Sequence, residues 1–174
     1  MLYFDQAANE RVRAIQAKLV TARSDSGKLT PSPRPHISLG ACQGINPESF
    51  RAPLAEFARQ SSTIRFELTA IGTFPTSDGV IFLTPAVSRA LLNLHERFSE
   101  LFGDYAVSPS SYYLPGSWVP HCTLALDVPD NSVAAALDLC RTADLPIHGS
   151  YERIGLVRFL PNEEIYCFDL GRRG

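Results

Sequence analysis

The sequence contains Arg34-Pro35-His36-Ile37-Ser38-Leu39 and, 85 positions after the first histidine, a similar stretch, Pro120-His121-Cys122-Thr123-Leu124. In each stretch a proline precedes the histidine, and a hydroxyl-bearing residue stands two positions after it. Because successive side chains of a β-strand point to opposite faces, the histidine and the hydroxyl share one face. We therefore expect two strands that each present an imidazole beside a hydroxyl and bury their other face.

The similarity extends beyond these two motifs and indicates an internal duplication, with approximate repeats at residues 2–80 and 81–170. A shift of 79 positions lays Tyr3 onto Phe82 and superimposes the apolar stripes of two helical patterns. The loop in the second copy is six residues longer than its counterpart in the first. The chain is therefore expected to fold as two similar halves.

Periodicity predicts the elements of each half. Helical patterns run from Ala8 to Leu19, from Asn46-Pro47, from Val87 to a stop near Gly103, and from Asp130. Strand-like segments are residues 2–4, 36–40, 63–70, 80–84, 121–126, 151–159 and 165–170.

The order of these elements predicts an α+β fold. In each copy it is strand, helix, motif strand, helix and strand. We expect a single bilobal domain over residues 1–174, with two pseudo-symmetric lobes that each hold an antiparallel sheet with helices on its outer side. A twofold arrangement of the lobes would bring the two motif strands face to face across one active-site cleft.

Composition limits the class of protein. A chain of 174 residues with 45% hydrophobic residues can bury one substantial core. Its net charge of -2 argues against a protein that grips long nucleic acid through bulk charge. No apolar run approaches a membrane span, and the first ten residues lack the pattern of a secretory signal. We expect a cytoplasmic monomer that acts on a small substrate without contacting a membrane.

The cysteines predict neither a disulfide framework nor a metal site. They form no CxxC pair and no spacing typical of zinc ligands, so reduced thiols are expected at Cys42, Cys122, Cys140 and Cys167. A histidine-based metal protein is a weak alternative, because no carboxylate or cysteine completes a ligand set with the motif histidines. No metal and no other cofactor is therefore expected.

Two imidazoles and two hydroxyls in one small volume suit phosphodiester chemistry. Because the unperturbed pKa of histidine is about 6.5, one ring can accept a proton while the other donates one. The hydroxyls of Ser38 and Thr123 can donate hydrogen bonds to the nonbridging oxygens of a phosphate between the rings. The motifs predict that His36 and His121 act as general acid and general base, and leave open which is which.

The two motifs resemble the paired H-x-[ST]-hydrophobic signatures of the 2H phosphoesterase superfamily, which includes 2'-5' RNA ligase-like proteins and RNA 2',3'-cyclic phosphodiesterases. Phe74-Pro75 with the strand-like segment after it, and the opening segment 2–4 with its helix, also resemble that family's layout. The similarity covers nearly the whole chain. It implies a bilobal α+β fold, no metal requirement, and a small nucleotide or an RNA terminus as substrate.

The resemblance also implies roles for individual residues. It assigns His36 and His121 to acid and base catalysis, and Ser38 and Thr123 to phosphate binding. This sequence departs from the family in having serine in the first motif, where threonine is commoner. Leu126 stands where bacterial cyclic phosphodiesterases often carry a basic residue. These departures leave the chemistry intact and the particular substrate open.

Three functions are compatible with the motifs. The first is metal-independent hydrolysis of 2',3'-cyclic phosphates or related 2'-linked phosphodiesters. The second is 2'-5' RNA ligation, or cleavage of 2'-5' oligonucleotides, at the same site. The third is a noncatalytic module that binds nucleotides or RNA ends. A matched acid and base disfavours the third, since binding alone does not need them.

Residues beside the motifs supply further candidates for substrate binding. Arg34 is in a position to contact a phosphate, although an exposed arginine at a strand entrance is the commoner interpretation. Tyr112 and Tyr113 lie in the longer loop, where they either stack on a nucleobase or pack the loop onto its lobe. Trp118 is expected to pack the loop.

The remaining histidines and arginines considered are not expected to take part in the site. His95 and His148 are interpreted as ordinary surface or boundary histidines. Arg65 and Arg158 fall on predicted strands, where a side chain facing the cleft would help to bind phosphate, but solvated positions on the outer face are expected.

Overall fold

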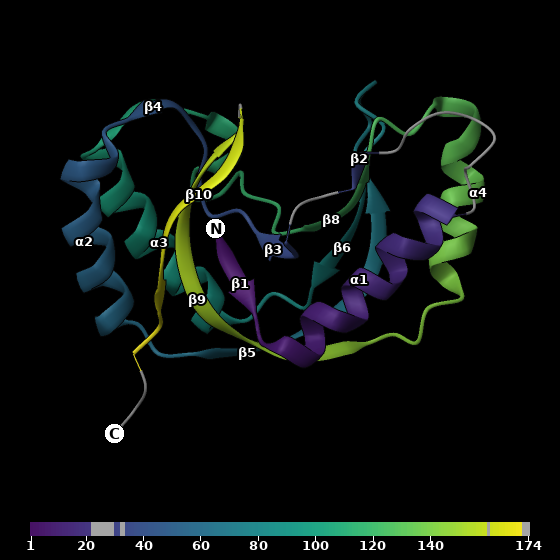
Figure 1. Cartoon of the computed structure of the whole chain (residues 1–174), viewed down its shortest axis with the longest axis horizontal. Helices are drawn as coiled ribbons and strands as arrows, with labels where there is room; N and C mark the ends of the chain where they lie inside the picture. The colour runs from purple at the N-terminus through teal and green to yellow at the C-terminus, as the bar shows by residue number, and fades with distance from the viewer. Residues whose placement is uncertain (22–29, 32–33, 160, 172–174) are drawn as a thin grey trace.

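The computed structural model describes residues 1–21, 30–31, 34–159 and 161–171 (Figure 1). The helices are α1 (Gln6–Thr21), α2 (Pro47–Gln60), α3 (Arg89–Gly103), α4 (Asp130–Arg141) and the short 3-10 helix η1 (Ser111–Tyr113). The strands are β1 (Leu2–Phe4), β2 (Thr30–Pro31), β3 (His36–Ile37), β4 (Cys42–Ile45), β5 (Ile64–Thr73), β6 (Ile81–Pro85), β7 (Ala106–Pro109), β8 (Cys122–Leu126), β9 (Ile147–Phe159) and β10 (Asn162–Asp169).

One curved antiparallel sheet holds most of these strands. Its order is β2-β8-β6-β5-β9-β1-β3, and β10 also pairs with β9. A separate two-stranded sheet consists of β4 and β7. When the two repeats are equated, β8-β6-β5 is the mirror image of β3-β1-β9 in this order. The sheet therefore has a pseudo-twofold centre between β5 and β9.

The two motif strands meet although they lie far apart in the strand order. Because the sheet curls, β3 packs against β8, and both lie near the middle of the molecule in Figure 1. On one side Tyr3 of β1 pairs with His36, and on the other Phe82 of β6 pairs with Thr123. The fold thus brings both histidine motifs to one region.

The helices cover the outer sides of the two lobes. In Figure 1, α2 and α3 lie at one end of the molecule and α1 and α4 at the other. Although α1 follows β1 directly, it packs on β8, β9 and α4, whereas α2 packs on β9 and β10. The expected α+β fold with antiparallel strands and outer helices is confirmed.

Local sequence signals account for two of the helix starts. The side chain of Asn46 accepts hydrogen bonds from the amides of Glu48 and Ser49, and Pro47 occupies the first helical position of α2. The hydroxyl of Ser88 accepts a hydrogen bond from the amide of Leu91 at the start of α3. Both caps satisfy amides that have no partner inside the helix.

The first motif strand is shorter than its sequence predicts. A strand was expected over 36–40, but the paired strand β3 ends at Ile37. The next two carbonyls, of Ser38 and Leu39, accept hydrogen bonds from side chains instead of from a neighbouring strand. Among the described residues, no helix is long and apolar enough to cross a membrane.

Candidate active site

The two motif histidines make the same hydrogen bond. Nδ1 of His36 lies 2.7 Å from the carbonyl oxygen of Arg34, and Nδ1 of His121 lies 2.7 Å from that of Val119. A carbonyl only accepts, so Nδ1 carries the proton in both rings and donates it. In the described part of the chain neither Nε2 has a hydrogen-bond partner. Each neutral ring therefore presents Nε2 as a free proton acceptor.

The two rings influence each other electrostatically. The pKa of His36 is lowered to about 4, chiefly by burial, with smaller contributions from the positive charges of the N-terminus and of His121. Burial also lowers the pKa of His121, partly offset by its bond to Val119. The thiol of Cys122, next to His121, lies against the backbone of His36. The two motif strands therefore lie against each other, and a charge on the imidazole of His121 is felt at that of His36.

Each imidazole packs against an aromatic ring from the neighbouring strand. Tyr3 stands edge-on to His36 with 6.3 Å between ring centroids. Phe82, which the repeat relates to Tyr3, lies 5.3 Å from the ring of His121, and Phe74 stands edge-on to it at 4.9 Å. These contacts restrict both rings and explain why burial dominates their pKa values.

The hydroxyl-bearing residues of the motifs are half-buried, with their strand neighbours buried on the opposite face. The hydroxyl of Ser38 contacts the sulfur of Met1 at 3.5 Å and lies beside the phenol of Tyr113. The carbonyl of Thr123 accepts a hydrogen bond from Gln16 at 3.1 Å. The alternation expected for both motifs is present in these burial patterns.

A small cavity of about 160 Å³ opens beside His36 and does not reach His121. Arg34 lines it, with its guanidinium 4.3 Å above the ring of Tyr3. The same guanidinium lies 3.9 Å from the carboxylate of Glu164, which accepts a hydrogen bond from the phenol of Tyr3. Asn162 completes the polar lining. Arg34 is thus held close to His36, and its charge is partly balanced.

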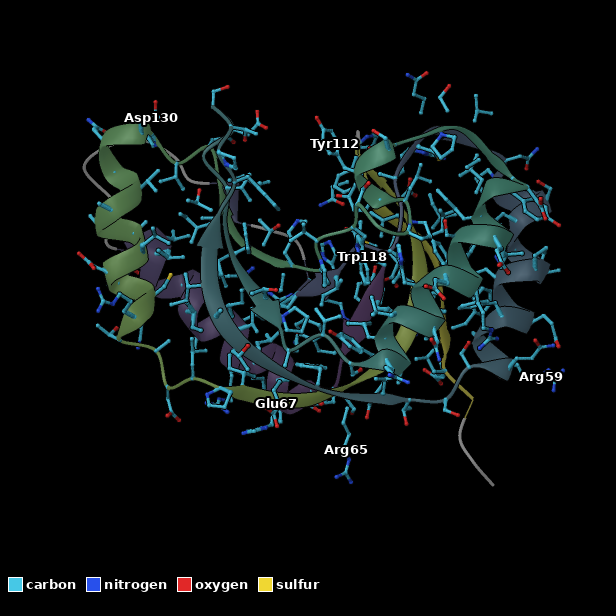
Figure 2. All side chains as sticks on the ribbon, turned by 180° about the vertical axis from the view of Figure 1, so that it is seen from behind. Arg59, Arg65, Glu67, Tyr112, Trp118 and Asp130 are labelled. Carbon is cyan, nitrogen blue, oxygen red and sulfur yellow. The ribbon has the colours of Figure 1, made fainter. Side chains whose placement is uncertain are left out.

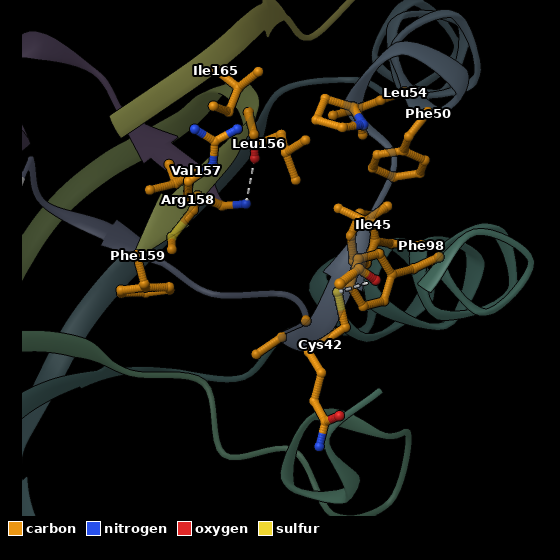
Figure 3. A pocket seen from close by; sticks show the side chains of 18 residues that line it. Cys42, Ile45, Phe50, Leu54, Phe98, Leu156, Val157, Arg158, Phe159 and Ile165 are labelled. Atoms are coloured by element: carbon orange, nitrogen blue, oxygen red, sulfur yellow. Dashed lines mark hydrogen bonds between the residues drawn. The ribbon is translucent and has the colours of Figure 1, made fainter. Parts of the chain in front are cut away.

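A larger cavity of about 480 Å³ adjoins the one beside His36 (Figure 3). Phe50, Leu54 and Phe98 line one side of it, and Leu156 and Val157 line the other. It shares residues 1 and 157 with the cavity beside His36. The two cavities are therefore neighbours, and the larger one is predominantly apolar.

The aromatic residues of the long loop lie in three different settings. Tyr112 is 81% exposed at the outer edge of the loop (Figure 2). Tyr113 is half-buried, with its phenol at Ser38. Trp118 is half-buried, and its indole nitrogen donates a hydrogen bond to the carbonyl of Ser38 at 3.0 Å. The expectation that Trp118 packs the loop agrees with these contacts.

The interpretation of His95 as a surface or boundary histidine is wrong. His95 is 2% exposed, stacks on Trp118, and places Nε2 between the carbonyls of Leu39 and Tyr113. Its place on the stripe of buried residues of α3 was the sequence signal for its burial. His148 is exposed and lies 3.4 Å from Glu67, as expected for a surface histidine.

The two arginines expected on outer faces are both exposed. Arg65 points away from the sheet into solvent (Figure 2). Arg158 lies 3.1 Å from Glu163 within the β9–β10 hairpin. Among the described residues, no group of three or more histidine, cysteine or acidic side chains is arranged to hold a metal ion.

The sequence model of the 2'-5' RNA ligase superfamily matches residues 3–163. The chain belongs to this superfamily. The resemblance to 2H phosphoesterases that the two motifs predicted is thereby confirmed, and the superfamily is one of phosphodiesterases and ligases. Both histidine motifs of this superfamily member lie inside the matched range.

Solved structures share the fold of this 2'-5' RNA ligase superfamily protein at low sequence identity. The crystal structure of TT0787 of Thermus thermophilus matches with a TM-score of 0.62 and 20% identity, over 99% of this chain and 97% of that chain. A crystal structure described as a phosphoesterase matches with a TM-score of 0.58 and 17% identity, over 98% of each chain. No curated protein matches the sequence.

Proposed function

We propose that the protein is a metal-independent phosphodiesterase that opens 2',3'-cyclic phosphates, or related 2'-linked phosphodiesters, of small nucleotides or RNA ends. The observation that carries this proposal is the matched pair of Nδ1–carbonyl hydrogen bonds at His36 and His121, which leaves both Nε2 atoms available. Proton transfer by each of two positioned groups contributes about 10²–10⁴-fold in rate. A histidine pair therefore suffices for a useful enzyme without a metal.

The unequal pKa values support a division of roles. His36, with a pKa of about 4, is neutral at the pH of most cells and suits the general base. For His121 the lowering is smaller, and the negative charge of a bound phosphodiester raises the pKa of a neighbouring imidazole. His121 then suits the general acid, because it is the ring that more readily holds a proton in the complex.

The proton transfers balance for hydrolysis. His36 Nε2 takes a proton from a water molecule as the water oxygen bonds to phosphorus. His121 Nε2 gives its proton to the ribose oxygen as the bond from that oxygen to phosphorus breaks. The product is a phosphomonoester, and the proton on His36 returns to His121 through solvent before the next turnover. Hydroxyls of Ser38 and Thr123 donate hydrogen bonds to the charged phosphate oxygens.

The residues around the motifs suit a small substrate. Arg34 beside His36 adds positive charge near the phosphate, and Tyr113 lies against Ser38 at the same place. Tyr112 is exposed enough to stack on a base, which is the interaction that aromatic residues offer single-stranded nucleotides. We propose a monomer that acts on nucleotides without gripping long nucleic acid.

The test is a substrate panel with alanine variants. Wild type, His36→Ala and His121→Ala are assayed with the four nucleoside 2',3'-cyclic monophosphates in the presence of a chelator. We expect turnover by the wild type and a loss of about 10²-fold or more in each variant. Full activity in either variant, or wild-type activity that the chelator abolishes, would reject the proposal.

A second candidate is ligation or cleavage of 2'-5' linkages at the same site, which the description of the matched family favours. The two activities share the acid and base and differ in whether water or a ribose hydroxyl attacks phosphorus. Assaying a 2'-5' linked dinucleotide beside a dinucleotide that ends in a 2',3'-cyclic phosphate distinguishes the two activities. Tight binding of either without any product would point instead to the noncatalytic module.

A further inference from the structure

Buried polar side chains form hydrogen bonds with backbone carbonyls of the two motifs. Apart from tyrosines and cysteines, the polar residues that the described part of the chain buries are Gln16, Ser61 and His95. Gln16 donates from Nε2 to the carbonyl of Thr123 at 3.1 Å. His95 places Nε2 at 3.1 Å from the carbonyl of Leu39. Two of these three side chains therefore serve the motif backbones.

Gln16 and His95 are equivalent positions of the internal duplication. They stand 79 positions apart, which is the shift that superimposes α1 on α3. Each reaches from one copy to the motif of the other copy: Gln16 to Thr123 in the second motif, and His95 to Leu39 in the first. Each motif thus accepts a hydrogen bond from a side chain on a helix of the other half.

Trp118 completes this arrangement on the side of the first motif. Its indole nitrogen donates to the carbonyl of Ser38 at 3.0 Å, and its ring lies on the imidazole of His95, with 3.9 Å between centroids and 8° between planes. Ser38 and Thr123 are equivalent motif positions, and the carbonyl of each accepts a hydrogen bond from a side chain, of Trp118 and Gln16 respectively. His95 also anchors the loop of Trp118 through the carbonyl of Tyr113 at 3.0 Å. The longer loop of the second copy therefore carries the donor that Ser38 needs.

These donors replace a missing strand. β3 pairs with β1 through His36 and Ile37 only, so Ser38 and Leu39 lie beyond the ladder. A buried carbonyl without a partner is costly, and the backbone therefore settles where the donors are. The backbone just beyond Ile37 is therefore held by Trp118 and His95, at two and three residues after His36.

We propose that Gln16, His95 and Trp118 are positioning residues that set the separation of the His36 and His121 imidazoles around the substrate phosphate. This inference rests on the proposed function. None of the three touches the reacting atoms. Because a displacement of about 1 Å in such a site can cost on the order of 10²-fold in rate, loss of a donor should act on kcat.

The test uses variants that remove one donor and keep apolar bulk. In Gln16→Leu and Trp118→Phe, we expect kcat for uridine 2',3'-cyclic monophosphate to fall by about 10-fold, with KM within about twofold. His95→Phe should behave likewise, and His95→Gln, which restores a donor, should recover part of the loss. Should Gln16→Leu not fold, Trp118→Phe decides, since Trp118 is half-buried on a loop.

Ser61→Ala is the matched control. It removes another buried hydrogen bond, from the Ser61 hydroxyl to the carbonyl of Phe57 at 2.7 Å, at the end of α2. It should lower Tm as the donor variants do while leaving kcat unchanged. The inference is overturned if Gln16→Leu and Trp118→Phe lower kcat no more than Ser61→Ala does.

A second measurement separates this inference from the proposed function. If the wild type turns over no cyclic phosphate, the proposed function fails, and NMR titration of ring-labelled histidine then decides the positioning. Trp118→Phe should shift the ring signals and pKa of His36, and Gln16→Leu those of His121, whereas Ser61→Ala shifts neither. Wild-type ring signals in both donor variants would overturn the inference.

Discussion

The ring of Phe74 stands edge-on to the imidazole of His121, with 4.9 Å between centroids and 82° between planes. Phe82 packs on the same imidazole at 5.3 Å, and the two phenyl rings lie 4.5 Å apart. His121 therefore occupies an apolar corner, and burial there lowers its pKa. His36 has the phenol ring of Tyr3 in the equivalent place, 6.3 Å away.

Replacing Phe74 should raise the pKa of His121. In Phe74→Ala, water reaches the imidazole, so its pKa moves up toward the ordinary value of 6.5. With His121 as the acid, the alkaline limb of kcat/KM moves to higher pH, and NMR titration of the ring shows the same shift. Phe159→Ala is the control, because Phe159 is 57% exposed. An alkaline limb that stays in place would contradict the role of Phe74.

The pH optimum of kcat/KM of the wild type should lie at acid pH. The base His36 must be deprotonated, so kcat/KM rises as pH increases through about 4. The acid His121 must be protonated, so kcat/KM decreases as pH rises through the pKa of His121. Because that pKa is lowered in the free enzyme, the decrease begins at a pH below 6.5. A bell centred between these limits is expected when kcat/KM is measured across the acid range. A value of kcat/KM that keeps rising up to pH 8 would show that the roles of base and acid are wrongly assigned to His36 and His121.

Folding stability should fall as the solution is acidified, and His36 should contribute to this. The folded state holds the pKa of His36 at about 4 against 6.5 in the unfolded chain, so the unfolded state binds more protons between these values. Stability contributed by the neutral ring is present above pH 6.5 and is lost as pH falls toward 4. Tm measured over this window should decline less steeply in His36→Ala than in wild type. Parallel curves would show that the pKa of His36 is not lowered by folding.

The site was predictable from sequence where local pattern determines structure. A strand alternates its side chains whatever surrounds it, so the shared face of His36 and Ser38, and that of His121 and Thr123, follow from spacing alone. The duplication predicted two equivalent halves. It did not predict that α1 packs on β8 of the other copy, because sequence symmetry does not specify how helices and strands pair.

What sequence missed was decided by tertiary contacts. The end of β3 at Ile37 depends on donors from Trp118 and His95, which are far away in sequence. The short strands β4 and β7 lack a run of β-branched residues, and only their pairing with each other marks them as strands. His95 lies on the buried stripe of α3, and its equivalence to Gln16 was a usable signal that a polar side chain was buried there for a partner.

Arg34 should contribute to substrate binding more than to turnover. Its guanidinium lies beside His36 but is shared with Glu164 at 3.9 Å. In Arg34→Ala we expect KM for a 2',3'-cyclic nucleotide to rise by about 10-fold, since a hydrogen bond to a charged group is lost, with kcat within about twofold. Steady-state kinetics at low and high salt checks this, with exposed Arg65→Ala as control. An unchanged KM would leave Arg34 with only its contacts to Tyr3 and Glu164.

The cysteines should divide into two reactivity classes. Cys122 and Cys140 are 0% and 1% exposed, and burial raises their pKa values to about 12 and about 11. Cys42 and Cys167 are half-buried, and burial raises their pKa values as well. Because the thiolate is the reactive form, a chromogenic disulfide reagent should modify Cys42 and Cys167 slowly in the native protein. Cys122 and Cys140 should react only on unfolding, since β8 must leave the sheet before the Cys122 thiol meets solvent. Rapid native-state labelling of Cys122, mapped by mass spectrometry, would mean that the second motif strand opens far more readily than its burial implies.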